Sequence, residues 1–378
     1  MSFNKYQVGL ACIEELGGAP IRRLLEKYGD EEAIWKMTDS EVNGLLTLTD
    51  KQKEAYISKR RRYDLDKTYE YVTSKKVKLV AYRDSIYPTQ LKKIPSPPSY
   101  LFYLGNLPKD DVPSVSIIGA RMCSEYGKEA AKYYSSVLSK NGVQVISGLA
   151  SGIDGISQRA ALDADGSSFG VLGSGIDVCY PVANKSLYKD LAIIGGVISE
   201  NPIGSKPLPY HFPMRNRIIS GLSDIVLVVE AKEKSGTLIT VSMALEQGKD
   251  VYALPGNYNS RLSLGCNKLI ADGAGIAYSP EVLLEELGMK YNIEKQNGAE
   301  ERIYNRLSKV DWTDEDEYKT AKELIKLLNK HDYDINQLYE ELKDITIEQL
   351  SYILMKLSME NIVSDSLGKY HLCNLCTS

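Results

Sequence analysis

Short apolar runs alternate with longer amphipathic stretches across the middle of the chain. The amphipathic stretches include 127–140 and 238–248, where apolar positions recur at helical spacing. The apolar runs have the uniform character of strands that are buried on both faces. They lie at 115–118, 143–146, 169–172, 197–198, 225–229 and 251–254. The alternation predicts an α/β fold with a Rossmann-like, doubly wound, mostly parallel sheet, and 78–81 predicts one more strand leading into it.

Both flanks of this region have a different pattern. Residues 1–75 show helical spacing interrupted by Gly17, Gly18 and Gly29, which predicts a helical N-terminal domain of the helix-hairpin-helix or SAM-like kind. The basic run 59–62 ends it, and either phosphate contact or a solvated helix end would explain that run.

The chain turns polar at 289–300, where we expect a linker between the region 76–288 and a last domain, 301–378. This last part predicts helices at 302–310 with 320–328, at 335–342 and at 347–360. Two β-like stretches follow, at 362–364 and 368–372. That order is typical of a winged-helix-like domain.

Length and composition set limits on the function. The 378 residues suggest two or three domains, and 43% apolar with 25% charged residues is ordinary for a globular protein. The start has no secretion signal and no apolar run is long enough to span a bilayer, so we expect a cytoplasmic protein with free thiols and no membrane association. Cys373 and Cys376 have only His371 nearby, so we expect no metal site.

Glycines and small polar residues follow three of the predicted strands. The segments are Gly119-Ala-Arg121, 147–154 and 173–177. Because ligands of open α/β sheets bind beyond the carboxyl ends of the strands, we expect a phosphate-binding cleft there, with Arg121, Ser147, Gly148 and Gly152 among its residues. A surface salt bridge is the alternative role for Arg121. No loop has the full dinucleotide fingerprint or a phosphate loop, so we expect no nucleotide cofactor.

The stretch 209–217 combines aromatic rings with guanidinium groups. Rings stack on unpaired bases while cations hold the backbone of a single strand, so Phe212, Arg215 and Arg217 are candidate DNA-binding residues. The alternatives are a core position for Phe212 and bonds from the two arginines to carbonyl oxygens at the sheet edge.

Six motifs in this order resemble the DNA-processing protein A (DprA/Smf) family. They are Ser116-Ile-Ile-Gly-Ala-Arg121, Ser147-Gly-Leu-Ala-Ser-Gly-Ile-Asp154, Tyr180-Pro-Val-Ala-Asn184, His211-Phe-Pro-Met-Arg-Asn-Arg-Ile-Ile219, Lys234-Ser-Gly-Thr-Leu-Ile-Thr240 and Leu254-Pro-Gly256. The resemblance covers about 80–285. It implies a homodimer that binds single-stranded DNA, protects incoming strands and loads the RecA recombinase in natural transformation. It also implies that Arg121 binds DNA and that Phe212 stacks on a base.

The sequence departs from the family pattern at two positions. Pro209 stands where the family often has a lysine, so Lys185 and Lys206 are expected to supply the missing positive charge. Gln158 stands where the family usually has a histidine, which argues against histidine-based chemistry.

Charge limits the role of the last domain. Residues 301–378 hold ten lysines and arginines against fifteen aspartates and glutamates, and Lys356 is the only basic residue of 347–361. Such a surface repels phosphate, so we expect this domain to contact a protein or another part of the chain.

Two other functions compete with DNA binding. Gly236-Thr237 is similar to a motif of nucleoside-monophosphate phosphoribohydrolases, but Thr240 stands where their acid would be. Asp154, Asp177 and Glu200 leave a paired-carboxylate enzyme conceivable, although helix capping or loop bonding explains them too. A sensor or carrier of small nucleotides could use the same cleft. We expect a binding protein without catalytic residues.

Overall fold

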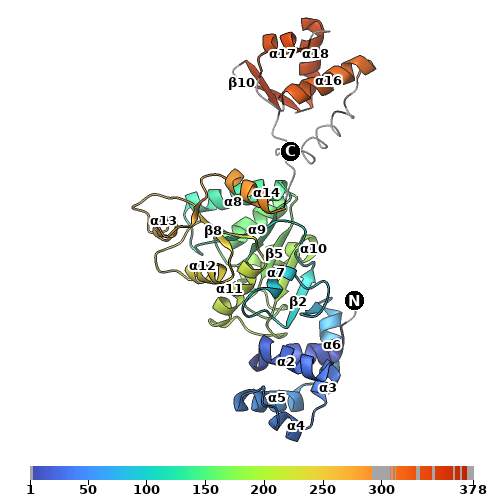
Figure 1. Ribbon diagram of the computed structural model, residues 1–378, viewed down its shortest axis with the longest axis vertical. Coiled ribbons are helices and arrows are strands. Elements are labelled where there is room, and N and C mark those ends of the chain that lie inside the picture. Colours follow the sequence, from blue (N-terminus) through green and yellow to red (C-terminus); the bar gives the residue numbers. More distant parts are fainter. Residues whose placement is uncertain are drawn as a thin grey trace. The chain divides into compact units, whose positions relative to one another are not determined.

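The computed structural model describes residues 3–291, 307, 310, 312–328, 333–342, 345–360, 362–366 and 368–372. The chain forms two compact units, Met1–Tyr291 and Asn292–Ser378 (Figure 1). Cys373, Cys376, most of the predicted linker and most of the predicted helix 302–310 lie outside the described residues. No helix in the described part of the chain has the length and apolar character needed to cross a membrane.

A nine-stranded sheet forms the centre of the first unit. Its order is β1-β2-β6-β5-β4-β3-β7-β8-β9, in which the strands from β6 to β9 run parallel while β1 and β2 are antiparallel additions at one edge. The strands are β1 (Lys78–Ala81), β2 (Tyr100–Gly105), β3 (Ser114–Ile118), β4 (Gln144–Ser147), β5 (Ser168–Val171), β6 (Gly196–Ser199), β7 (Ile225–Val228), β8 (Asp250–Ala253) and β9 (Gly275–Ile276). The prediction of a mostly parallel α/β sheet is confirmed.

Helices cover both faces of this sheet (Figure 1). Alternate strand residues point to opposite faces, so β3 places Ile117 in one core and Ile118 in the other. One face packs against α8 (Glu125–Lys140), α9 (Ile153–Asp163) and α14 (Pro280–Tyr291). The other packs against α7 (Thr89–Lys92), α11 (His211–Gly221), α12 (Thr237–Glu246) and α13 (Leu264–Ala271). Near the β1–β2 edge, η2 (Val182–Asn184) precedes α10 (Lys185–Ile194).

Some elements of the first unit were not predicted from the sequence, among them β2 and α11. The run Tyr100–Gly105 was not assigned as a strand, although it is an apolar run after the turn-forming prolines. His211–Gly221 is a helix, an element that we did not predict for the stretch before 225–229. Proline is tolerated in the first turn of a helix because that turn has no intrahelical donor to lose, so Pro213 does not prevent α11 from forming.

The N-terminal helices pack beside the β1–β2 edge and share a core with it. They are α1 (Lys5–Ala11), η1 (Glu14–Leu16), α2 (Gly18–Tyr28), α3 (Glu31–Trp35), α4 (Asp39–Asn43), α5 (Asp50–Arg62) and α6 (Leu65–Ser74). Capping boxes at Asn4, Thr38 and Thr49 start three of them, so their beginnings are set locally.

The second unit has its own core of leucines and isoleucines. Its elements are α16 (Glu315–Leu328), α17 (Ile335–Glu341), α18 (Ile347–Met359) and the antiparallel hairpin β10 (Val363–Ser366) and β11 (Lys369–Leu372).

Candidate nucleic-acid interface

A groove of about 610 Å³ opens where the strand order of the sheet reverses. The order runs from β3 through β4, β5 and β6 to one side, and from β7 through β8 and β9 to the other. Such a reversal leaves a crevice at the carboxyl ends of the two central strands. Here the loop after β3, the loop after β7 and the first turns of α11 form the groove walls.

Three exposed cations line the groove. Arg121 comes from the loop after β3, and Lys232 and Lys234 come from the loop after β7. Within the described residues, none of the three forms an ion pair with a carboxylate. Their charge is therefore available to an anionic ligand.

Two aromatic rings lie beside these cations. The centroids of the Phe212 and Tyr180 rings are 5.7 Å apart, and the Arg121 Cζ lies 5.4 Å from the centroid of Phe212. Phe212 packs closely on Gly173, where an added Cβ would come within 2.8 Å of the ring. The ring is half-buried and still lines the groove, so one part of it remains available for contact with a ligand.

The groove floor contains two buried side chains of opposite charge. Asp154 and Arg215 are 8% and 5% exposed, and both line the groove. Burial raises the pKa of the Asp154 carboxyl, while the Arg215 charge and the Gly148 N–H act in the opposite direction. Burial lowers the pKa of Arg215 to about 10, still far above neutral pH.

Three of the nine predicted site residues line the groove, namely Arg121, Phe212 and Arg215. The Arg215 side chain differs from the expected role, because its guanidinium donates to the carbonyl oxygens of Gly148 and Val171 and so supports the floor. Arg217 lines a different cavity, and its Nη2 lies 2.5 Å from Glu200 Oε2. Carbonyl bonding, the alternative for these arginines, describes Arg215 well.

The other predicted residues lie below or beside the groove. Ser147 is fully buried and donates to the Ile117 carbonyl at 2.6 Å, and Gly148 is buried beneath Arg215. Gly152 has φ +78° and packs against the backbone of the Arg121 loop, so it supports that loop. Lys185 and Lys206 are exposed but do not line the groove.

The sequence-based set omitted Lys232, Lys234 and Tyr180. The rule that ligands bind at strand carboxyl ends was applied to the loops after β3, β4 and β5. Applied to the loop after β7 as well, it would have identified both lysines, because they follow Val228 within a few residues.

The three carboxylates considered for an enzyme do not share one site, and each already has a bonding partner within the protein. Asp154 is in the groove floor, whereas Glu200 pairs with Arg217 in the other cavity. Asp177 accepts from the Tyr71 hydroxyl at 3.0 Å and from the Gly204 N–H at 2.8 Å. Each carboxylate therefore has a structural role, and only Asp154 lines the groove.

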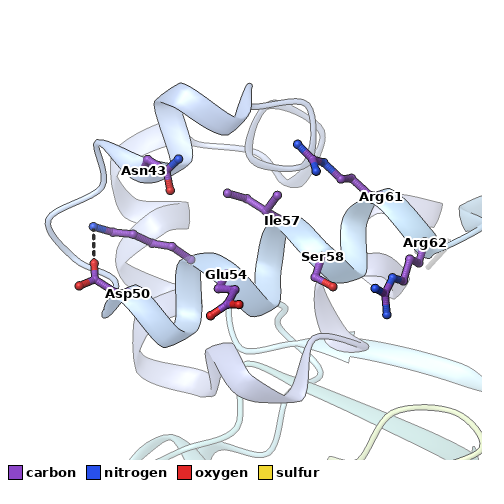
Figure 2. Close-up of a pocket in the computed structure, with 8 residues that line it drawn as sticks. Asn43, Asp50, Glu54, Ile57, Ser58, Arg61 and Arg62 are labelled. Atoms are coloured by element: carbon purple, nitrogen blue, oxygen red, sulfur yellow. Dashed lines mark hydrogen bonds and ion pairs between the residues drawn. The ribbon is translucent and has the colours of Figure 1, made fainter.

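A second hollow, of about 640 Å³, lies along α5 (Figure 2). Figure 2 shows Arg61 and Arg62 at one end and Asp50, which pairs with Lys53, at the other. Arg61 pairs with Asp39, as does Arg60, and Lys59 pairs with Glu15 at 2.9 Å. Three of the four basic side chains of this run already pair with carboxylates of the same helical region, which favours the interpretation as a helix end over phosphate contact.

Comparisons with known proteins point in one direction. The model of the family described as DNA recombination-mediator protein A matches residues 78–288. Protein Smf of Synechocystis sp. is 35% identical over 291 residues, which cover 76% of this chain and 73% of that protein. The DNA processing protein DprA of Streptococcus pneumoniae is 43% identical over 203 residues, which cover 54% and 72%.

Two solved structures resemble the chain. The X-ray structure of DNA processing protein A from Streptococcus pneumoniae has a TM-score of 0.66 and 35% identity, covering 76% of this chain and 99% of that one. A structure of DNA processing protein A from Helicobacter pylori has a TM-score of 0.52 and 28% identity, covering 57% and 97%. The latter protein is described as having a unique single-stranded DNA binding mode.

Proposed function

This chain belongs to the DNA recombination-mediator protein A family, and we propose that it binds single-stranded DNA in the groove between the carboxyl ends of β3 and β7. The observation that carries the proposal is the Arg121 guanidinium beside the Phe212 ring, with Lys232 and Lys234 on the opposite loop.

The chemistry of the groove matches an unpaired strand. Aromatic faces stack on bases of any identity, and each stacked base contributes about 1–3 kcal/mol to binding. Cations on both loops would hold phosphates on either side of the stacked base. Because none of these groups reads a base edge in a defined pattern, binding would show little sequence preference.

We further propose that the protein acts as a cytoplasmic homodimer that protects incoming strands and loads the RecA recombinase, without catalysis of its own. Family membership supports these roles. The described cysteines are free thiols, in keeping with a reducing compartment. Leu264 and Ile276, on α13 and the edge strand β9, are 41% and 47% exposed, which supports a dimer face there.

The flanking parts would serve other purposes. The N-terminal helices would form the helix-hairpin-helix or SAM-like domain, and the second unit would be winged-helix-like. In α18, Lys356 is 14% exposed, lies 3.0 Å from Glu317 and sits over the rings of Trp312 and Tyr352. With its one cation engaged in this way, α18 suits contact with protein better than contact with phosphate.

The test is binding of a fluorescent oligo-dT strand and of a duplex of equal length at two salt concentrations. Wild type should bind the strand selectively and more weakly at high salt, and Arg121→Glu should abolish most of that binding. Arg23→Glu is the matched control, because Arg23 is exposed on α2 and outside the groove.

Four outcomes would overturn the proposal. One is the absence of strand binding by wild type, and another is full binding by Arg121→Glu. The third is competition by thymidine monophosphate as effective as that of the linked strand, which would indicate a small-nucleotide site. Release of free base from a nucleotide would indicate the hydrolase alternative.

A further inference from the structure

The side chain of His211 connects the first turn of α11 to the N-terminal helices. Its Nε2 lies 2.9 Å from Oε1 of Glu14, which is 197 residues earlier in the chain. The His211 side chain is 2% exposed and that of Glu14 is 37% exposed. Both line a cavity of about 170 Å³ that the groove-lining Phe212 and Arg121 do not share.

Glu14 is held firmly relative to the sheet. It begins η1, whose Leu16 is 1% exposed and accepts from Gln52 Nε2 at 3.1 Å through its carbonyl. The neighbouring helices are bonded to the sheet region, where the Ser99 hydroxyl donates to the Gly18 carbonyl at 2.6 Å. The Tyr100 hydroxyl lies 3.1 Å from Glu31 Oε1. The backbone that carries the Glu14 carboxylate is therefore held in place relative to the sheet.

The beginning of α11 has no cap of its own. Tyr210, in the N-cap position, makes no side-chain hydrogen bond to the helix. Glu14 supplies a carboxylate near this end from a distant part of the chain, which suits the partial positive charge of a helix N-terminus. The position of the first turn of α11 thus depends on a residue outside the helix.

Phe212 follows His211 directly in that turn. Its ring fits between Gly173, Tyr180 and Arg121, so a small shift of the first turn would move the ring against these neighbours. We propose that Glu14 is a positioning residue for single-stranded DNA binding, because through His211 it sets the orientation of the Phe212 ring. This inference rests on the proposed function of the groove.

The direction in which DNA affinity changes when Glu14 is removed distinguishes a positioning role from a purely electrostatic one. Removing a negative charge from a DNA-binding protein should strengthen its binding through long-range attraction. If Glu14 positions Phe212, its removal should instead weaken binding. Glu15 is the matched control, because it is the next residue, has the same charge and pairs with Lys59 within the N-terminal helices.

The experiment compares full-length wild type with Glu14→Ala, Glu14→Gln and Glu15→Ala. Affinity is measured with oligo-dT, and stacking is measured at saturation by the quenching of a 2-aminopurine base in the strand. Glu14→Ala should weaken binding roughly threefold to tenfold, as expected for part of one charged hydrogen bond, and should reduce the quenching. Glu14→Gln retains a group that can bond to His211, so its affinity and its quenching should be close to those of wild type. Glu15→Ala should also keep the affinity and the quenching of wild type.

A second background tests the route through the ring. With Phe212→Leu in place, Glu14→Ala should have little further effect, because the residue that it positions is gone. If Glu14→Ala does not fold by circular dichroism, Glu14→Asp, with its shorter reach, replaces it.

The outcomes distinguish this inference from the proposed function. Unchanged affinity and quenching in Glu14→Ala would overturn the inference alone, as would an equal loss in the Phe212→Leu background. Failure of wild type to bind the strand at all would overturn the proposed function.

Discussion

Asp154 and Arg215 bind the two backbone polar groups of one residue, Gly148. The Gly148 N–H donates to Asp154 Oδ2 at 3.1 Å, and the Gly148 carbonyl accepts from Arg215 Nη1 at 2.6 Å. The loop that begins the groove floor is therefore held by a buried pair of opposite charges.

Replacing Arg215 by Met should destabilise the first unit. The change leaves Asp154 buried without its cation, so we expect a loss of about 3–5 kcal/mol in the free energy of unfolding. The measurement is a urea titration in a Trp312→Phe background, in which Trp35 is the one remaining tryptophan and reports the first unit. Arg217→Met is the control and should cost less, because its partner Glu200 keeps 26% of its side-chain exposure. Equal losses would contradict the special role of the floor pair.

Lys232 and Lys234 should contribute to the salt dependence of strand binding. Changing both to Gln should weaken oligo-dT binding and reduce the slope of log affinity against log salt by roughly 0.7 for each phosphate that the variant no longer neutralises. Lys185→Gln with Lys206→Gln makes the same charge change outside the groove and should leave the slope unchanged. If the slope fell only in the variant of Lys185 and Lys206, these two lysines, which were predicted from the sequence, would be the ones that contact DNA.

Gly152→Ala should displace the Arg121 loop. An added Cβ would overlap the carbonyl oxygens of Ala120 and Arg121, so we expect oligo-dT affinity to fall roughly tenfold, the equivalent of one charged hydrogen bond. Gly142→Ala is the control, because Gly142 has a similar φ of +79° but open space around it. Both changes carry backbone strain of about 1–2 kcal/mol, so only the difference in affinity reports the overlap. Equal affinities for the two variants would mean that the loop after β3 accommodates the added Cβ without displacing Arg121.

Lys356→Met should destabilise the second unit without changing DNA affinity. The substitution removes an ion pair and the packing of the ammonium group over two rings, and we expect a cost of about 1 kcal/mol. Urea unfolding followed by Trp312 emission in a Trp35→Phe background measures it, with Lys369→Met in the same unit as control. A clear loss of strand affinity would instead indicate that α18 touches DNA.

Much of the sheet was predictable because parallel strands buried on both faces leave continuous apolar runs. The prediction of 78–81 matches β1, and the others differ from the observed strands by one or two residues at their ends. Arg121 was identified for a related reason, since the end of β3 determines where its loop lies.

Other parts of the candidate site depend on the packed fold. Nothing local indicates that Arg215 bends back to two carbonyls, because Val171 belongs to a strand 44 residues earlier. Lys185 and Lys206 were plausible by charge, but only the path of the chain separates them from the groove. The Glu14–His211 contact joins residues that are 197 positions apart, and no periodicity in the sequence encodes it.

The pairing of β3 with β7 also determines when the groove comes into being. Ser114 and Asp224, which bond across these strands, are 110 residues apart in sequence. During synthesis, Arg121 leaves the ribosome long before Lys232 and Lys234, so an unfinished chain possesses one wall of the groove without the other. The complete groove therefore forms late, after β7 has been made and has paired with β3. A partly made or partly unfolded molecule would therefore lack the complete groove in which we propose that DNA binds.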